Sequence, residues 1–224
     1  MGECNDYHFR KLSFRNNTGQ TSLATFQVTD YFGRQGEYKM NTSSQPRLWG
    51  LIVKTSVVHT LTYFLMGILA LNLLHYSDSF ASGALACFMR PTSSPWAAAG
   101  VGLQPIRGLI FALAFYPLRE IFFGKKNGWL IMWWVLVALG ILSTFAAAVG
   151  SVEGAIYTIL PISIANYLEV VPQAFLLSGI LFYWVNHPEK KWLNWVLGIL
   201  FVLVFLMSVM GTLAAIGVLK VPAA

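Results

Sequence analysis

Hydrophobic residues in this chain are gathered into five long runs, and polar residues are confined to a leading segment and to the connections between the runs. The runs cover approximately residues 51–75, 97–118, 129–150, 165–186 and 193–219. A helix needs roughly 20 residues to cross ~30 Å of hydrocarbon, and each run is long enough to do so. The pattern predicts an all-α fold, a polytopic membrane helix bundle with about five transmembrane helices.

Residues 1–46 are polar and show no sustained apolar period, whereas residues 47–224 hold all five runs. We interpret the first part as a flexible leader and the second as a transmembrane domain. The leader lacks the short apolar core that follows a charged start in a secretory signal peptide. Met40 begins a stretch that is typical of a natural start before a first helix. We therefore leave open whether residues 1–39 belong to the native protein.

Composition agrees with the membrane interpretation. Hydrophobic residues make up 56% of the chain and charged residues 11%, whereas soluble domains contain about 25% charged residues. The net charge of +6 does not form a basic stripe with interleaved aromatic residues, so a nucleic-acid partner is not expected. Composition of this kind is typical of small multi-pass proteins of a bacterial inner membrane. The expected location is the cell membrane, with the lipid bilayer as partner.

Lysine and arginine are distributed unequally between the two sides of the predicted bundle. One side holds seven of them: Arg47, Lys54, Arg119, Lys125, Lys126, Lys190 and Lys191. The other side holds two, Arg90 and Lys220. Cytoplasmic loops of membrane proteins carry the excess of positive charge. The count predicts a cytoplasmic N-terminus and an external C-terminus.

Arg107 is the least expected residue of the chain, because it lies ten positions into the second run. An arginine at the centre of a membrane helix costs at least ~2.5 kcal/mol and should have a partner. We predict that Glu169 is this partner, since it enters the fourth run from the same side, with Gln104 and Gln173 as polar neighbours. The pair is interpreted either as a substrate or proton site or as a structural ion pair that fixes helix register.

Two further residues are secondary candidates. His59 lies within the first run, and haem ligation there would need a second histidine at similar depth; we expect a histidine that packs between helices instead. Glu153 lies in a glycine-flanked turn, Gly150–Gly154, that leads into a short stretch, 155–164, too short to cross a membrane. An ordinary turn between helices is the expected role. No metal or cofactor is predicted.

Common catalytic signatures, such as a phosphate-binding loop or a nucleophile elbow, are not found in the sequence, and no catalytic residue is predicted. Small residues recur at helix-contact spacing in the third and fifth runs: Gly140, Thr144, Ala148, Ser208, Gly211 and Ala215. Such residues allow membrane helices to approach closely. The leading functional prediction is a non-enzymatic subunit or scaffold in a membrane complex, with other subunits or a second copy as partners. The alternative is a small transporter or transporter subunit with a polar site at Arg107 and Glu169, and an intramembrane enzyme ranks third.

Overall fold

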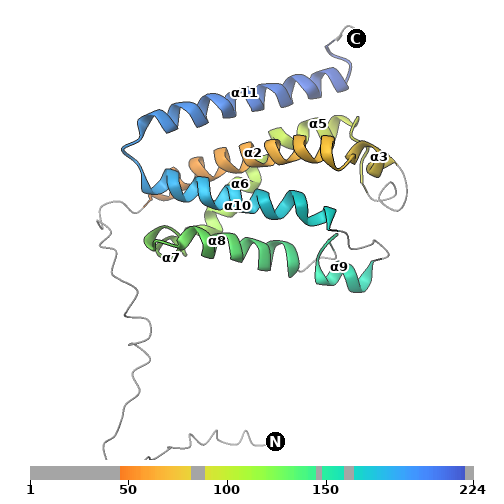
Figure 1. Cartoon of the computed structure of the whole chain (residues 1–224). Helices are drawn as coiled ribbons and strands as arrows, with labels where there is room; N and C mark the ends of the chain where they lie inside the picture. The colour runs from red at the N-terminus through yellow and green to blue at the C-terminus, as the bar shows by residue number, and fades with distance from the viewer. Residues whose placement is uncertain (1–45, 82–88, 145–147, 159–163, 220–224) are drawn as a thin grey trace, which may run out of the picture. The chain divides into compact units, whose positions relative to one another are not determined.

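The computed structural model describes residues 46–81, 89–144, 148–158 and 164–219 (Figure 1). All of them belong to the unit of the chain that runs from Tyr38 to Ala224. The predicted leader lies outside the described residues except for Pro46. The described residues form helices and connections without any strand, which confirms the all-helical prediction for this part of the chain.

Three helices are long and apolar enough to cross a membrane, and a bent pair makes a fourth candidate. The three are α2 (Leu48–Leu73), α10 (Ala165–Asn186) and α11 (Lys191–Ala215). The bent pair consists of α5 (Pro95–Gly102) and α6 (Gln104–Phe115), whose axes differ by 41°. These elements cover the first, fourth, fifth and second hydrophobic runs.

The third run forms a shorter helix than its hydrophobicity suggests. It begins as α8 (Gly128–Val137) and continues as one π-helical turn, η2 (Ala138–Leu142). In this last turn the Ser143 N–H bonds to the Ala138 carbonyl, five residues back, at 2.9 Å, and the chain leaves helical geometry at Ser143. The helix of about 22 Å that results is shorter than the ~30 Å hydrocarbon core. The described helices therefore supply up to four candidate spans, one fewer than the sequence predicts.

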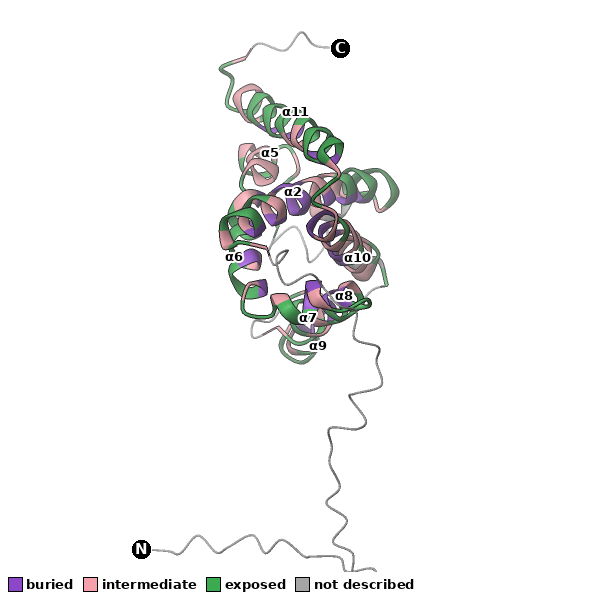
Figure 2. Ribbon diagram, turned by 90° about the vertical axis from the view of Figure 1, so that its left-hand side faces the viewer, coloured by how far each residue is buried: buried purple, intermediate pink, exposed green. Residues whose placement is uncertain are grey.

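Helix α2 is the centre of the bundle. It packs against α5, α6, α10 and α11, and Figure 2 shows these helices around it. Four consecutive residues of α2, 57–60, are buried. Successive residues of an α-helix point in directions about 100° apart, so four buried in a row require neighbours on several sides.

The starts of α2, α8 and α11 lie at the same end of the bundle as the end of α10 (Figure 1). Two hydrogen bonds join the termini of α2, α10 and α11. The Lys54 ammonium donates to the Trp184 carbonyl at 2.9 Å, and the Trp184 indole N–H donates to the Asn194 side chain at 2.6 Å. A cation at the carboxyl end of α10 is favourable because carbonyl groups there carry partial negative charge. The hydrophobic core lies towards the same end and includes Leu51, Phe115, Phe122, Leu181 and Leu193.

Three short helices complete the described unit: α3 (Tyr76–Ala81), α7 (Arg119–Gly124) and α9 (Val152–Tyr157). Helix α7 joins α6 to α8 at the end of the bundle that holds Lys125, Lys126, Lys190 and Lys191, which we call the basic end. Helices α3 and α9 lie at the opposite end (Figure 1). Helix α9 overlaps the start of the 155–164 stretch that the sequence predicts to be too short to cross, and Pro161, which follows it, lies outside the described residues.

Candidate functional site

The break between α5 and α6 has two causes, one of them local. Pro105 stands in the first turn of α6. It has no N–H to donate to the carbonyl four residues back, and its ring disfavours a continuous helix. The local sequence therefore predicts a weak point near Leu103, where α5 ends.

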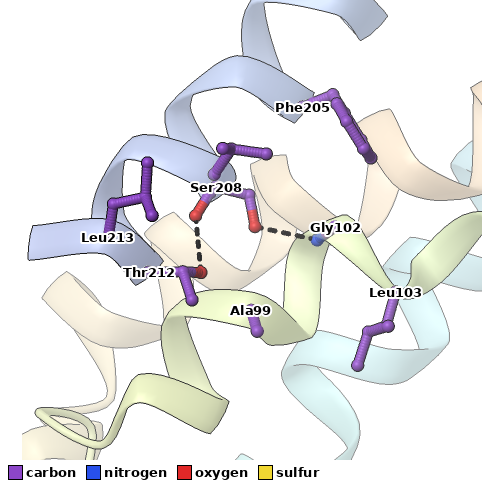
Figure 3. Close-up of a pocket in the computed structure, with 8 residues that line it drawn as sticks. Ala99, Gly102, Leu103, Phe205, Ser208, Thr212 and Leu213 are labelled. Atoms are coloured by element: carbon purple, nitrogen blue, oxygen red, sulfur yellow. Dashed lines mark hydrogen bonds between the residues drawn. The ribbon is translucent and has the colours of Figure 1, made fainter. Parts of the chain in front are cut away.

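The second cause is a hydroxyl group that α11 contributes. The Gly102 N–H donates to the Ser208 Oγ at 2.9 Å, and this hydroxyl donates to the Ala98 carbonyl at 2.7 Å. In an unbroken helix the Gly102 N–H and the Ala98 carbonyl would bond to each other directly. Figure 3 shows Ser208 beside Gly102 in this position. Insertion of a side chain into the helical hydrogen-bond ladder bends a helix, so α11 helps to hold α5 and α6 in their bent arrangement.

A buried polar pair follows the break directly. The side chains of His59 and Gln104 approach within 3.0 Å, from Nε2 to Oε1, and the Gln104 amide nitrogen donates to the Gly100 carbonyl at 3.0 Å. Because the amide nitrogen is committed to a carbonyl, the Gln104 oxygen faces His59, which makes His59 Nε2 the donor. His59 Nδ1 is then the acceptor of a neutral imidazole. It is buried and has no hydrogen-bond partner among the described atoms.

Helices α2 and α6 touch closely beside this pair. A Cβ atom added to Gly108 would lie 2.4 Å from the Ser56 Cα. The Ser56 hydroxyl donates to the Pro105 carbonyl at 3.1 Å across the same contact. Glycine at this position lets the two backbones approach, as small residues do where membrane helices cross. The contact fixes the distance between His59 and the residues of α6.

Arg107 is exposed on α6. Its guanidinium lies 5.8 Å from the centre of the Phe111 ring, and the His59 ring meets the same aromatic ring edge-on at 5.0 Å. The charge of Arg107 acts on both His59 and Tyr63. Phe111 thus brings the arginine and the buried histidine together around one aromatic side chain.

Glu169 has a different partner from the one that the sequence predicts. It accepts a hydrogen bond of 2.5 Å from the Tyr76 hydroxyl of α3, and the described residues hold no ion pair between Arg107 and Glu169. Burial, this hydrogen bond, the charge of Glu169 and the nearby Tyr63 together raise the pKa of Tyr76. The two predicted partners instead act on Tyr63 together, since it feels the charge of each.

Gln173 and Glu153 stand apart from this cluster. Gln173 follows Pro172 inside the continuous helix α10, and within the described ranges it forms no hydrogen bond with the other candidate residues. Glu153 lies in the first turn of α9, whose N-cap is Ser151. Both glycines are required here, because Gly150 has a φ of +85° and a Cβ atom on Gly154 would lie 2.0 Å from the Ala148 carbonyl oxygen. The Glu153 turn is therefore a compact connection between helices.

Sequence analysis did not single out Tyr63, Tyr76 or Phe111. Spacing could have pointed to two of them. Tyr63 lies four residues after His59 and Phe111 lies four residues after Arg107, so each pair shares a helix face. Tyr76 lies just beyond the first hydrophobic run, where no pattern predicts that α3 turns back towards α10.

A pocket of about 250 Å³ lies between α5 and α11. Its lining is mostly apolar, and Figure 3 shows Ser208 and Thr212 among the side chains that line it. In the described part of the chain, no group of three or more His, Cys, Asp or Glu side chains is placed to hold a metal ion. The pocket offers apolar contact, whereas His59, Arg107, Tyr63 and Glu169 are not among the residues that line it.

Comparisons with protein-family models, with curated proteins and with solved structures found no match. No family, and no relative of known activity, therefore bears on what this chain does. Function has to be inferred from its residues and their geometry.

Proposed function

We propose that the protein is a multi-pass protein of the cell membrane with about five spans. Three helices and the bent pair are apolar enough to cross, and we propose that the shorter apolar helix Gly128–Leu142 is the fifth span. Exposed apolar side chains on every long helix support this proposal. A water-soluble protein rarely exposes apolar surface on this scale.

The basic end of the bundle is proposed to face the cytoplasm, which puts the C-terminus outside. Trp49, Trp192 and Trp195 are exposed at this end, where tryptophan is favoured at a membrane–water interface. The test uses cysteine variants in a background with Cys4 and Cys87 changed to serine. Glu153→Cys should react with an impermeant maleimide in intact cells, and Lys126→Cys should react only after the membrane is opened. The reverse labelling would refute this orientation.

Within the membrane, we propose that the protein is a non-enzymatic subunit of a complex, and helix α11 carries this proposal. Only 17% of its most apolar window is buried, against 39% for α2 and 33% for α10. Its exposed apolar side chains cover most of the circumference of the helix: Trp195, Val196, Ile199, Leu200, Val202, Leu203, Leu206, Met207 and Met210. A long apolar surface that the described helices leave uncovered can pack against a helix of another protein.

Site-specific photo-crosslinking tests the subunit proposal. A photoreactive residue replaces Ile199, which is exposed, or Leu197, which is 8% exposed and belongs to the core. The proposal predicts a discrete protein adduct from position 199, either a second copy or another membrane protein, and none from position 197. Adducts with lipid alone from position 199 would contradict it.

A transporter is the second candidate, favoured by the broken helix with a buried polar pair at the break. Discontinuous helices form the substrate sites of several transporter folds. Transport predicts that water reaches this level of the bundle in one of its states. Gln104→Cys, in the background without Cys4 and Cys87, should then react with a water-soluble maleimide. Complete protection of that cysteine in membranes would count against transport and leave the subunit proposal unaffected.

A further inference from the structure

We propose that Arg107 and His59 together form a binding site for an anionic oxygen group, a carboxylate or a phosphate, which is bound with one proton. The proposal concerns binding alone and does not depend on whether the protein is a subunit or a transporter. Each of the two residues lacks one interaction that such a ligand would supply.

Arg107 lacks a counter-charge. It is exposed on α6 within the bent helix pair, and no acidic side chain of the described residues is paired with it. The Phe111 ring at 5.8 Å gives the guanidinium a cation–π contact, which does not neutralise its charge. The planar guanidinium is suited to the two oxygens of a carboxylate or a phosphate. An anion at Arg107 would also relieve the cost of an unpaired charge in the membrane.

His59 lacks a proton donor. It is 1% exposed, and its Nδ1 lone pair has no partner among the described atoms. Buried polar atoms are nearly always hydrogen-bonded, so an exception of this kind calls for an explanation. A proton shared between Nδ1 and an oxygen of the ligand would give this atom a partner, since Nε2 already carries its own proton towards Gln104.

The two requirements complement each other electrostatically. A proton on His59 adds a second positive charge near Arg107, and the negative charge of the ligand offsets it. If the ligand arrives as the neutral acid, its O–H bond breaks, the proton moves to Nδ1, and the conjugate anion remains beside Arg107. If it arrives as the anion, the proton comes from water. Either route ends with the same species and the same charge.

Among the described residues, no acidic side chain acts on His59. Among charged groups, Arg107 of α6 acts on His59, and helix α5, which faces the same side of α2, has no titratable side chain. The negative charge of Glu169 acts on Tyr63 and Tyr76 instead. On helix α11 the titratable side chain is that of Lys191, at its start. The described residues do not supply the negative charge that accompanies a proton at His59, and in this proposal the ligand supplies it.

The experiment measures binding to the full chain in nanodiscs of phosphatidylcholine. Acetate and inorganic phosphate are titrated as free anions while tryptophan fluorescence is recorded. In a separate arm, nanodiscs that contain phosphatidylglycerol test a lipid headgroup as the source of the phosphate. Saturable binding of acetate or phosphate supports a soluble ligand, and a phosphatidylglycerol-dependent change that needs Arg107 supports a lipid. The absence of any response in all arms overturns the proposal.

A matched pair of variants tests the role of the arginine. Arg107→Gln should weaken binding at least about tenfold, because it removes one member of a charge-assisted pair. Arg90→Gln is the control, since Arg90 also lies over an aromatic ring, that of Trp96 at 5.5 Å, but outside the cluster. An equal loss in both variants would reduce the effect to net charge and refute the site.

Proton uptake tests the role of the histidine. In a weakly buffered solution with a pH indicator, anion binding to the unmodified protein should remove close to one proton per anion. His59→Gln should abolish this uptake. If that variant does not fold, the unmodified protein still decides the question, because binding without proton uptake removes His59 from the site.

Discussion

The contact between α2 and α6 makes a quantitative prediction about Gly108. In Gly108→Ala the new Cβ would lie 2.4 Å from the Ser56 Cα and 3.0 Å from the Ser56 backbone nitrogen. Carbon atoms in van der Waals contact are about 3.5–4.0 Å apart. The two helices must therefore separate by about 1 Å at this contact. Both backbones are regular helices there, so neither can move locally to make room.

The expected cost follows from what this separation disturbs. Overpacking of a tight interface costs about 1–3 kcal/mol. The Ser56–Pro105 and His59–Gln104 hydrogen bonds, at 3.1 and 3.0 Å, cross the same contact, and each is worth about 0.5–1.5 kcal/mol. Alanine returns up to about 1 kcal/mol through its higher helix propensity. The net loss of stability should be near 3 kcal/mol, or roughly 6–12 °C in the thermal midpoint.

Thermal unfolding in mild detergent, followed by size-exclusion chromatography of the remaining folded protein, measures this loss. Gly67→Ala is the matched control, because it lies on the same helix as Ser56 and an added Cβ there would meet nothing within 4 Å. It should be neutral or slightly stabilising. If Gly108→Ala and Gly67→Ala melt at the same temperature, the close packing of α2 on α6 is refuted.

Three further substitutions have expected effects on the stability of the fold. Ser208→Ala removes two hydrogen bonds that join α11 to the bent helix pair and should cost about 1–3 kcal/mol in thermal unfolding; an unchanged midpoint would show that this hydroxyl does not hold the bend. Lys54→Met removes the bond to the Trp184 carbonyl and should cost about 1 kcal/mol, allowing for partial exposure, whereas Lys54→Arg should retain most of that stability. Burial and the hydrogen bond to Glu169 raise the pKa of Tyr76, so the folded state holds this proton more tightly than the unfolded state does. The stability that results is present below the ordinary tyrosine pKa of about 10 and is lost as the pH rises above it; Tyr76→Phe should flatten this alkaline decline, and parallel curves would contradict the assignment.

The long helices could be predicted because their length and composition are local properties. Runs 51–75 and 165–186 overlap α2 and α10 almost completely. Of the two causes of the bend in the second run, only one is local in the sequence. Pro105 is visible in the sequence, but the hydroxyl of Ser208 comes from 106 residues beyond Gly102, and hydropathy carries no information about such a contact. The helix of the third run ends in one π-helical turn followed by the non-helical backbone of Ser143, and a hydrophobic window cannot resolve such local geometry.

Small residues illustrate a similar limit. Spacing singled out Ser208 and Gly211, and both face α5, since a Cβ on Gly211 would lie 3.8 Å from that of Ala98. Spacing also singled out Gly140, where an added Cβ meets no described atom within 4 Å. The close contact at Gly108 was not singled out, although Ala112, four residues further on, is also a small residue buried on α6. Small residues at this spacing occur on many helices, so the spacing does not tell which pair lies at a close helix contact.

The charged residues show what a sequence can establish about a membrane site. Depth along a helix follows from counting residues, and it placed Arg107 and Glu169 on related levels. The direction in which each side chain points depends on how helices rotate and bend, and here it gives Glu169 the Tyr76 hydroxyl at 2.5 Å and Arg107 the Phe111 ring. The physical requirement for a counter-charge at Arg107 is unchanged by this outcome. Because no described residue meets it, we assign the requirement to a ligand, a lipid or another subunit, and an arginine left unpaired by the described residues becomes an argument for a binding site.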